Sequence, residues 1–94
     1  MTVRWPSKAP GETADYDLDW SLRLSAGDVI TASTWTLPES STLTKVSDAF
    51  ISTVTKIFLS GGLINQTYVL TNTVTTQLGD TLVETVSILI KDRG

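Results

Sequence analysis

The sequence predicts an all-β protein, an immunoglobulin-like antiparallel β-sandwich of about six or seven strands that follows an extended N-terminal arm. Threonine is the commonest residue, and the chain is poor in Ala, Glu and Lys, which is a composition typical of strands. Several segments alternate apolar and polar residues, and none has a clear helical period. Turn residues recur about every 8–12 positions, the spacing typical of sandwich strands. A small closed barrel is the alternative architecture.

The length of the chain bounds the size of its core. With 94 residues it forms one domain. A domain this short buries only about 60–65% of the surface that the unfolded chain exposes. We therefore expect a thin core that gains stability from neighbouring proteins.

The first half of the sandwich starts with a strictly alternating segment, residues 15–24, in which every even position is apolar. This period of two predicts a strand with one buried and one solvated face. A turn at residues 25–28 leads to a strand at 29–37, which Pro38 ends because proline donates no hydrogen bond. Ser40 and Ser41 are predicted to lie in a loop. Residues 43–50 alternate poorly, with Val46, Phe50 and Asp48 sharing a side, so a bulge or an edge strand is expected there.

The second half contains a strand at residues 53–59, a turn at Gly61-Gly62, a strand at 67–76, a hairpin turn at 78–80 and a last strand at 81–91. The two glycines are expected to supply positive φ angles. The inward-facing positions predict the core, which consists of Tyr16, Leu18, Trp20, Trp35, Tyr68, Val74, Val86 and Ile88.

Residues 1–12 differ from the sandwich domain, residues 13–94, because they contain two of the three prolines. Such a stretch is extended and pairs poorly in a sheet. Tryptophan and arginine are common anchors of protein interfaces. The candidate partner-binding residues are therefore Val3, Arg4, Trp5, Pro6, Lys8 and Pro10. The alternative is that Trp5 folds back onto its own sandwich.

The composition argues against several functions. Without His or Cys, the chain can form neither a Ser-His-Asp nor a Cys-His catalytic unit, so we expect no enzyme and no cofactor. Its seven basic residues are scattered and its net charge is −3, which argues against nucleic acid as a partner. Apolar runs are too short for a membrane helix, and the first residues lack the apolar core of a signal peptide. We expect synthesis in the cytoplasm.

Two acidic features could in principle carry chemistry. Asp15, Asp17 and Asp19 alternate along the first strand, but the glycine and glutamate that a calcium loop needs are missing. They are more simply the solvated face of a strand, where charges discourage edge-to-edge aggregation. Glu84 lies on the apolar face of the last strand, so either it lies near a strand end or it pairs with Lys45 or Lys56. A structural ion pair is expected rather than a catalytic acid.

Three segments together resemble a known family: residues 4–10 leading into 15–20, residues 27–35, and residues 60–62 with 66–74. The specific elements are Tyr16-Asp17-Leu18-Asp19-Trp20 and Ser33-Thr34-Trp35. The chain resembles the small virion proteins of tailed bacteriophages that are described as fibre–tail adaptors. Relatives often have Lys-Asp-Pro in the arm, where this chain has Lys8-Ala9-Pro10.

The resemblance implies a structural protein of the virion, made in the bacterial host cytoplasm. It would dock on tail, neck or baseplate subunits, present a site for a fibre, and assemble in symmetric copies. A capsid decoration protein and a carbohydrate-binding module for host attachment are the alternatives. The last of these would present exposed aromatic residues on one face.

Overall fold

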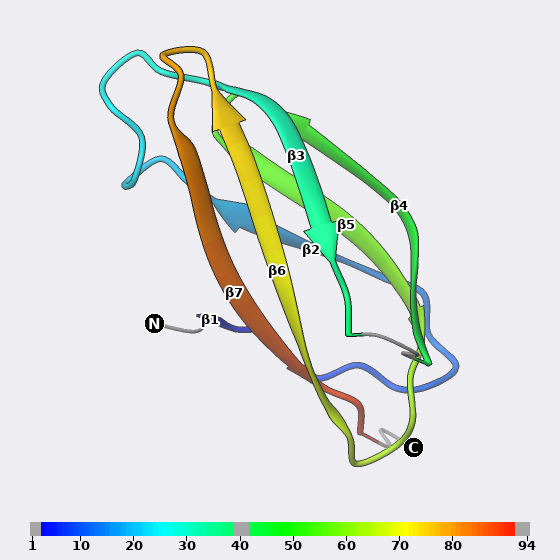
Figure 1. Ribbon diagram of the computed structural model, residues 1–94. Helices are drawn as coiled ribbons and strands as arrows, with labels where there is room; N and C mark the ends of the chain where they lie inside the picture. The colour runs from blue at the N-terminus through cyan, green and yellow to red at the C-terminus, as the bar shows by residue number, and fades with distance from the viewer. Residues whose placement is uncertain (1–2, 39–41, 92–94) are drawn as a thin grey trace.

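Seven strands form two sheets that pack face to face in the computed structural model, which describes residues 3–38 and 42–91 (Figure 1). The four-stranded sheet has the order β1 (Val3–Arg4), β7 (Thr81–Leu89), β6 (Thr67–Thr76), β3 (Ile30–Thr36). The three-stranded sheet has the order β2 (Ala14–Asp19), β5 (Val54–Gly61), β4 (Leu43–Ile51). The predicted all-β sandwich is confirmed. Nothing in the described part of the chain is a helix able to cross a membrane.

The strand order agrees with the predicted immunoglobulin-like class. If β2 to β7 are lettered B to G in chain order, the sheets read B-E-D and G-F-C, which is the order of immunoglobulin domains. Tyr68 adds a second similarity, because it lies near the start of β6 and its hydroxyl accepts a hydrogen bond of 2.8 Å from the Leu63 N–H. A tyrosine at this corner is typical of such sandwiches. The assignment to this class stays a prediction that both features support.

The predicted strand at residues 15–24 is wrong in its second half. β2 ends at Asp19, and Leu22 is 99% exposed. The chain turns here because the N–H groups of Arg23 and Leu24 both donate to the Trp20 carbonyl, at 2.8 and 3.1 Å. The Asp19 carboxylate accepts the Ser21 N–H at 2.9 Å. Local hydrogen bonds therefore outweigh the continued alternation of apolar residues.

The other strands match their predicted segments more closely. β6 has the predicted bounds, and the last strand ends at Leu89, two residues earlier than expected. β4 lies at the edge of its sheet and has a register shift between Lys45 and Ser47, as the poor alternation indicated. Gly61 and Gly62 have φ angles of 75° and 98°, which confirms their role in the turn. The predicted loop at Ser40-Ser41 lies outside the described residues.

The core contains all eight residues that the sequence predicted. It also contains a polar group, the fully buried side chain of Asn72 on β6. Its Oδ1 accepts hydrogen bonds from Trp20 Nε1 at 3.2 Å and Thr55 Oγ1 at 2.7 Å, while its Nδ2 donates to Ser33 Oγ and the Thr34 carbonyl, both at 3.0 Å. These bonds join the two sheets through the middle of the sandwich, because Thr55 lies on β5 in the three-stranded sheet.

Asp28 ties two loops together at one end of the sandwich. Its side chain is buried, and Oδ1 accepts the N–H groups of Val29 and Leu78 at 2.9 and 3.1 Å. Burial raises the pKa of this carboxyl, but hydrogen bonds lower it by more, so that the pKa lies below its usual range; the donors are the Thr76 hydroxyl and the backbone N–H groups of Leu78, Val29 and Gln77.

A consequence is that Asp28 should contribute to the acid sensitivity of folding. Because its folded pKa is depressed, its contribution to stability is fully present above about pH 4 and is lost as the pH falls through the folded value. We expect Asp28→Asn to lower the free energy of unfolding at pH 7. The difference in this free energy between the variant and the wild type should be smaller at pH 3. Urea unfolding at both pH values measures this. An equal deficit at both would show that the charge of Asp28 is not involved.

Candidate partner interface

The N-terminal segment lies on the sandwich and contributes to its core. β1 pairs in parallel with β7, and Trp5 is only 7% exposed. The Trp5 ring stacks on Tyr16 with 4.8 Å between ring centroids and lies 5.6 Å from Trp35. Trp5 therefore folds back, which was the alternative that the sequence left open. Of the other apolar candidates, Val3 and Pro6 are exposed, whereas Pro10 is half-buried.

Lys8 is buried as well, although the sequence grouped it with the binding residues. Its Nζ donates to the carbonyls of Gly61 and Ala9, both at 2.7 Å. Burial lowers the pKa of the Lys8 ammonium, and the nearby charge of Glu12 partly offsets this effect. The backbone of Lys8 bonds to the last residue of β7 and to the second residue beyond it, since its N–H donates to the Leu89 carbonyl and its carbonyl accepts the Lys91 N–H. Lys8 thus holds the N-terminal segment on the sandwich through buried hydrogen bonds. The cation of this segment that faces outward is Arg4.

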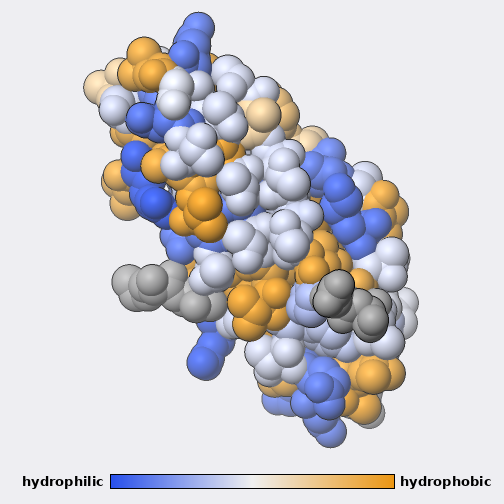
Figure 2. Space-filling model, viewed as in Figure 1, coloured by the Kyte–Doolittle hydropathy of each residue, from blue (hydrophilic) through white to orange (hydrophobic). Residues whose placement is uncertain are grey.

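The outer face of the four-stranded sheet is almost uncharged. Residues on β6 alternate between buried positions such as Leu70 and Val74 and outward positions such as Thr71 and Thr73. With the strand register, this alternation defines the outer face as Arg4, Ala32, Thr34, Thr36, Thr67, Val69, Thr71, Thr73, Thr75, Thr81, Val83, Thr85, Ser87 and Leu89. Arg4 is the one charged residue among these positions. Figure 2 shows this face as mostly pale, with residues of intermediate hydropathy and some hydrophobic ones.

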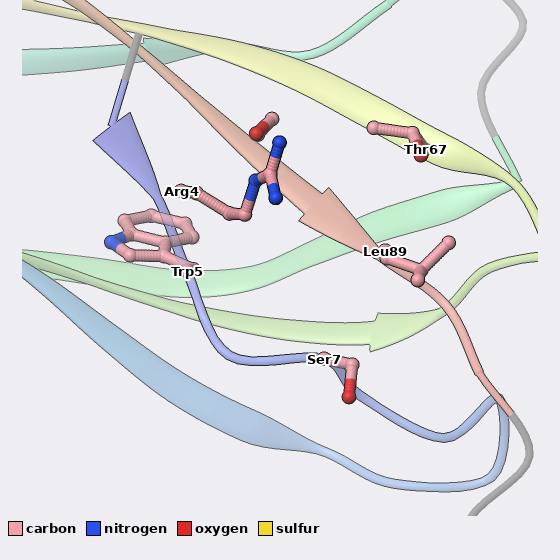
Figure 3. Close-up of a pocket in the computed structure, with 6 residues that line it drawn as sticks. Arg4, Trp5, Ser7, Thr67 and Leu89 are labelled. Atoms are coloured by element: carbon pink, nitrogen blue, oxygen red, sulfur yellow. The ribbon is translucent and has the colours of Figure 1, made fainter.

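A shallow hollow of about 350 Å³ lies at the margin of this face, where β1 meets β7 (Figure 3). Its lining consists of Arg4, Trp5, Ser7, Thr67, Ser87 and Leu89. In Figure 3 the Arg4 side chain extends from β1 toward β7, and Thr67 and Leu89 lie farther along the hollow. A guanidinium in this place can form two parallel hydrogen bonds to a carboxylate. The hollow is therefore suited to an acidic side chain of another protein.

Comparison with known proteins gives the family. A family model described as "Podophage GP4 fiber-tail adaptor protein gp77" matches residues 8–89. The chain belongs to this family. The resemblance found in the sequence is thereby confirmed, and the family is one of structural phage proteins, which is not an enzyme class. A comparison with curated proteins gives no match.

The matched range of the fibre–tail adaptor family starts at Lys8, so β1, Arg4 and Trp5 lie before it. The family range thus includes the six longer strands. The two-residue strand that completes the four-stranded sheet and Trp5, which packs against Tyr16, thus lie outside the matched range.

The three-stranded sheet of this adaptor family member carries more charge on its outer side. Asp15, Asp17 and Asp19 are exposed along β2, which is an edge strand, and Lys56 pairs with Asp15 at 3.2 Å. This agrees with their interpretation as the solvated face of a strand. Among residues 3–38 and 42–91, no group of three acidic side chains could hold a metal ion.

Glu84 forms an ion pair, but with a residue that the sequence analysis did not name. Its partner is Arg23 at 3.4 Å, so the expected pairing with Lys45 or Lys56 is wrong. Lys45 pairs instead with Asp48 at 2.9 Å. The turn after β2 explains the difference, because it carries Arg23 to the start of β7, where the guanidinium also donates to the Val83 carbonyl. The sequence analysis missed this contact because the alternating pattern predicted a strand that continued through residue 24, without the turn that brings Arg23 to β7.

Proposed function

We propose that this chain is a structural adaptor of the phage particle, which joins tail, neck or baseplate subunits to fibres through protein–protein contacts and is present in symmetric copies. The family indicates the adaptor role. The observation that supports a protein contact is the outer face of the four-stranded sheet, a broad surface with one charge at its margin.

The physical reason is the cost of removing charges from water. The centres of protein interfaces are depleted in charged residues, because an unpaired charge that loses its water is expensive to bury. Threonine and valine side chains on a regular sheet are already rigid, so they lose little conformational entropy when a partner covers them. The Arg4 guanidinium at the margin would pair with an acidic residue of the partner and set its orientation.

The carbohydrate-binding alternative has less support. Sugar-binding faces present aromatic rings, yet every Trp and Tyr of the chain is buried: Trp5, Trp20, Trp35, Tyr16 and Tyr68. The described partly exposed aromatics, Phe50 and Phe58, lie on β4 and β5 and so do not belong to the threonine-rich face.

Introducing a charge into this face tests the proposal. We expect Val69→Glu to weaken binding to either the tail or the fibre protein of the same phage by at least tenfold, since about 1.4 kcal/mol corresponds to a factor of ten. Val69 is 49% exposed on β6, so the fold should tolerate the change. Biolayer interferometry with each purified partner measures the effect.

Val46→Glu is the matched control, because Val46 is a similarly exposed valine, 56%, on β4. Its affinity should stay within about threefold of wild type. Equal losses in the two variants would argue against the threonine-rich face as the contact, and a wild-type chain that binds neither partner would argue against the adaptor role.

A further inference from the structure

One end of the sandwich presents an aliphatic side chain on each of three neighbouring loops. Leu22 lies in the loop between β2 and β3, Ile51 at the β4–β5 turn and Leu78 at the β6–β7 turn, all at the upper end in Figure 1. Their exposed fractions are 99%, 77% and 65%, the highest of all large hydrophobic side chains within the described residues. These three residues are called the tip cluster below.

Hydrogen bonds between the loops hold this end together. They run from Trp20 N to the Thr53 carbonyl at 2.8 Å, from Ile30 N to the Ser52 carbonyl at 2.8 Å, and from Gln77 N to the Val29 carbonyl at 2.9 Å. Because the loops are already ordered, they lose little conformational entropy when a partner binds. Most of the free energy of the new contacts would therefore appear as affinity.

Further contacts fix the backbone around two members of the tip cluster, Leu22 and Leu78. The residue after Leu22 is Arg23, whose guanidinium lies over the Trp20 ring at 5.1 Å and bonds to the Val83 carbonyl at 3.1 Å. The N–H of Leu78 donates to the buried Asp28 carboxylate. A leucine that is held out into water by such contacts costs solvation free energy in the isolated chain, and that cost is recovered when a partner covers it.

The charge of this end indicates what covers it. Four acidic residues belong to these loops or contact them, namely Asp19, Asp28, Asp80 and Glu84, against one basic residue, Arg23. The difference equals the net charge of the whole chain, −3, so the remaining six acidic and six basic residues cancel. Because this end is negatively charged, two copies of the chain that met there would repel each other. An anionic lipid surface would repel this end for the same reason.

We infer that the tip cluster is a second docking surface of this chain, and that its partner is another virion protein with an apolar hollow edged by Lys or Arg side chains. The inference builds on the proposed function, since an adaptor needs two separate surfaces. The tip cluster lies at one end of a sandwich whose extents are 43 × 23 × 22 Å, whereas the threonine-rich face lies along its side. One chain can thus bind two proteins at once.

The test uses the full chain with purified tail protein and purified fibre protein as separate probes. The variant Leu22→Ser/Ile51→Ser/Leu78→Ser removes the tip cluster, and its matched control is Leu63→Ser/Ile64→Ser/Val46→Ser, at positions 46–56% exposed. We expect the tip variant to lose at least tenfold in affinity for one probe and to keep the other, while the control keeps both within threefold. Asp19→Lys/Asp80→Lys should slow association with that same probe.

The outcomes separate the inference from the function on which it rests. If the wild type binds both probes and the tip variant binds them equally well, the inference is overturned and the adaptor role stands. If the wild type binds neither, the proposed function fails. Vesicles of neutral and of anionic phospholipid complete the set; capture of the wild type, but not the tip variant, by either would overturn the choice of a protein partner. Circular dichroism of each variant confirms that it is folded.

Discussion

Replacement of Asn72 by alanine is expected to destabilise the protein by about 3–5 kcal/mol, because it removes the acceptor that two buried donors share, removes the donor to the Thr34 carbonyl and opens a small cavity. The donors are Trp20 Nε1 and Thr55 Oγ1, both of which bond to Asn72 Oδ1. For a domain of this size such a loss is a large part of the total free energy of unfolding. Urea unfolding, followed by tryptophan fluorescence, measures it.

Thr73→Ala is the control for this prediction. Thr73 is the next residue on β6 but points outward and is half-buried, so the expected loss is below about 1 kcal/mol. A variant at Asn72 that unfolds at nearly the wild-type urea concentration would show that the bonds across the two sheets are not needed. A large loss of stability in the Asn72 variant, together with a small loss in Thr73→Ala, would show that the buried amide stabilises the contact between the two sheets.

Replacement of Trp5 by alanine should have an effect of similar size, about 3–5 kcal/mol, because a buried tryptophan is removed from a thin core. The free energy is lost from contacts with Tyr16 and Trp35. Lys8 still holds the end of the segment, but the two-residue β1 cannot stay paired by itself, so we expect β1 to detach from β7. Hydrogen exchange should then increase above all at the backbone N–H of residue 5, which donates to the Ser87 carbonyl.

Trp5→Phe keeps an aromatic ring and should cost less than half as much, which makes it the matched control. If Trp5→Ala retained wild-type stability and exchange rates, the segment would not be docked in solution, and Trp5 would again be available as an anchor for a partner. When the segment is docked, the residue that is available to a partner is Arg4, which lines the hollow beside β7.

The charge distribution shows why an interface is hard to read from a sequence. Threonines on alternate positions of β6 and β7 predict a solvated sheet surface, and their lack of charge becomes informative only after the register brings Thr71 beside Thr85 and Thr73 beside Val83. In the same way, Leu22, Ile51 and Leu78 are more than 25 residues apart in sequence and meet at one end only through the hydrogen bonds between loops.

By itself the sequence determined the all-β class, the bounds of β6, the bulged edge strand β4 and the eight predicted core residues. It could do so because side chains alternate with a period of two and because Gly79 and Gly61-Gly62 provide positive φ angles at the turns. These are local properties, which neighbouring residues specify without the rest of the chain.

Only the tertiary structure decided the place of the N-terminal segment, the end of β2 and the partner of Glu84. Trp5 is buried because Tyr16 and Trp35, from two other strands, form a site that a tryptophan fills. Leu22 is exposed because backbone groups bond to the Trp20 carbonyl and turn the chain away from the core. The burial of Trp5 depends on contacts between residues distant in sequence, whereas the exposure of Leu22 depends on local backbone hydrogen bonds that the alternation of side chains does not reveal.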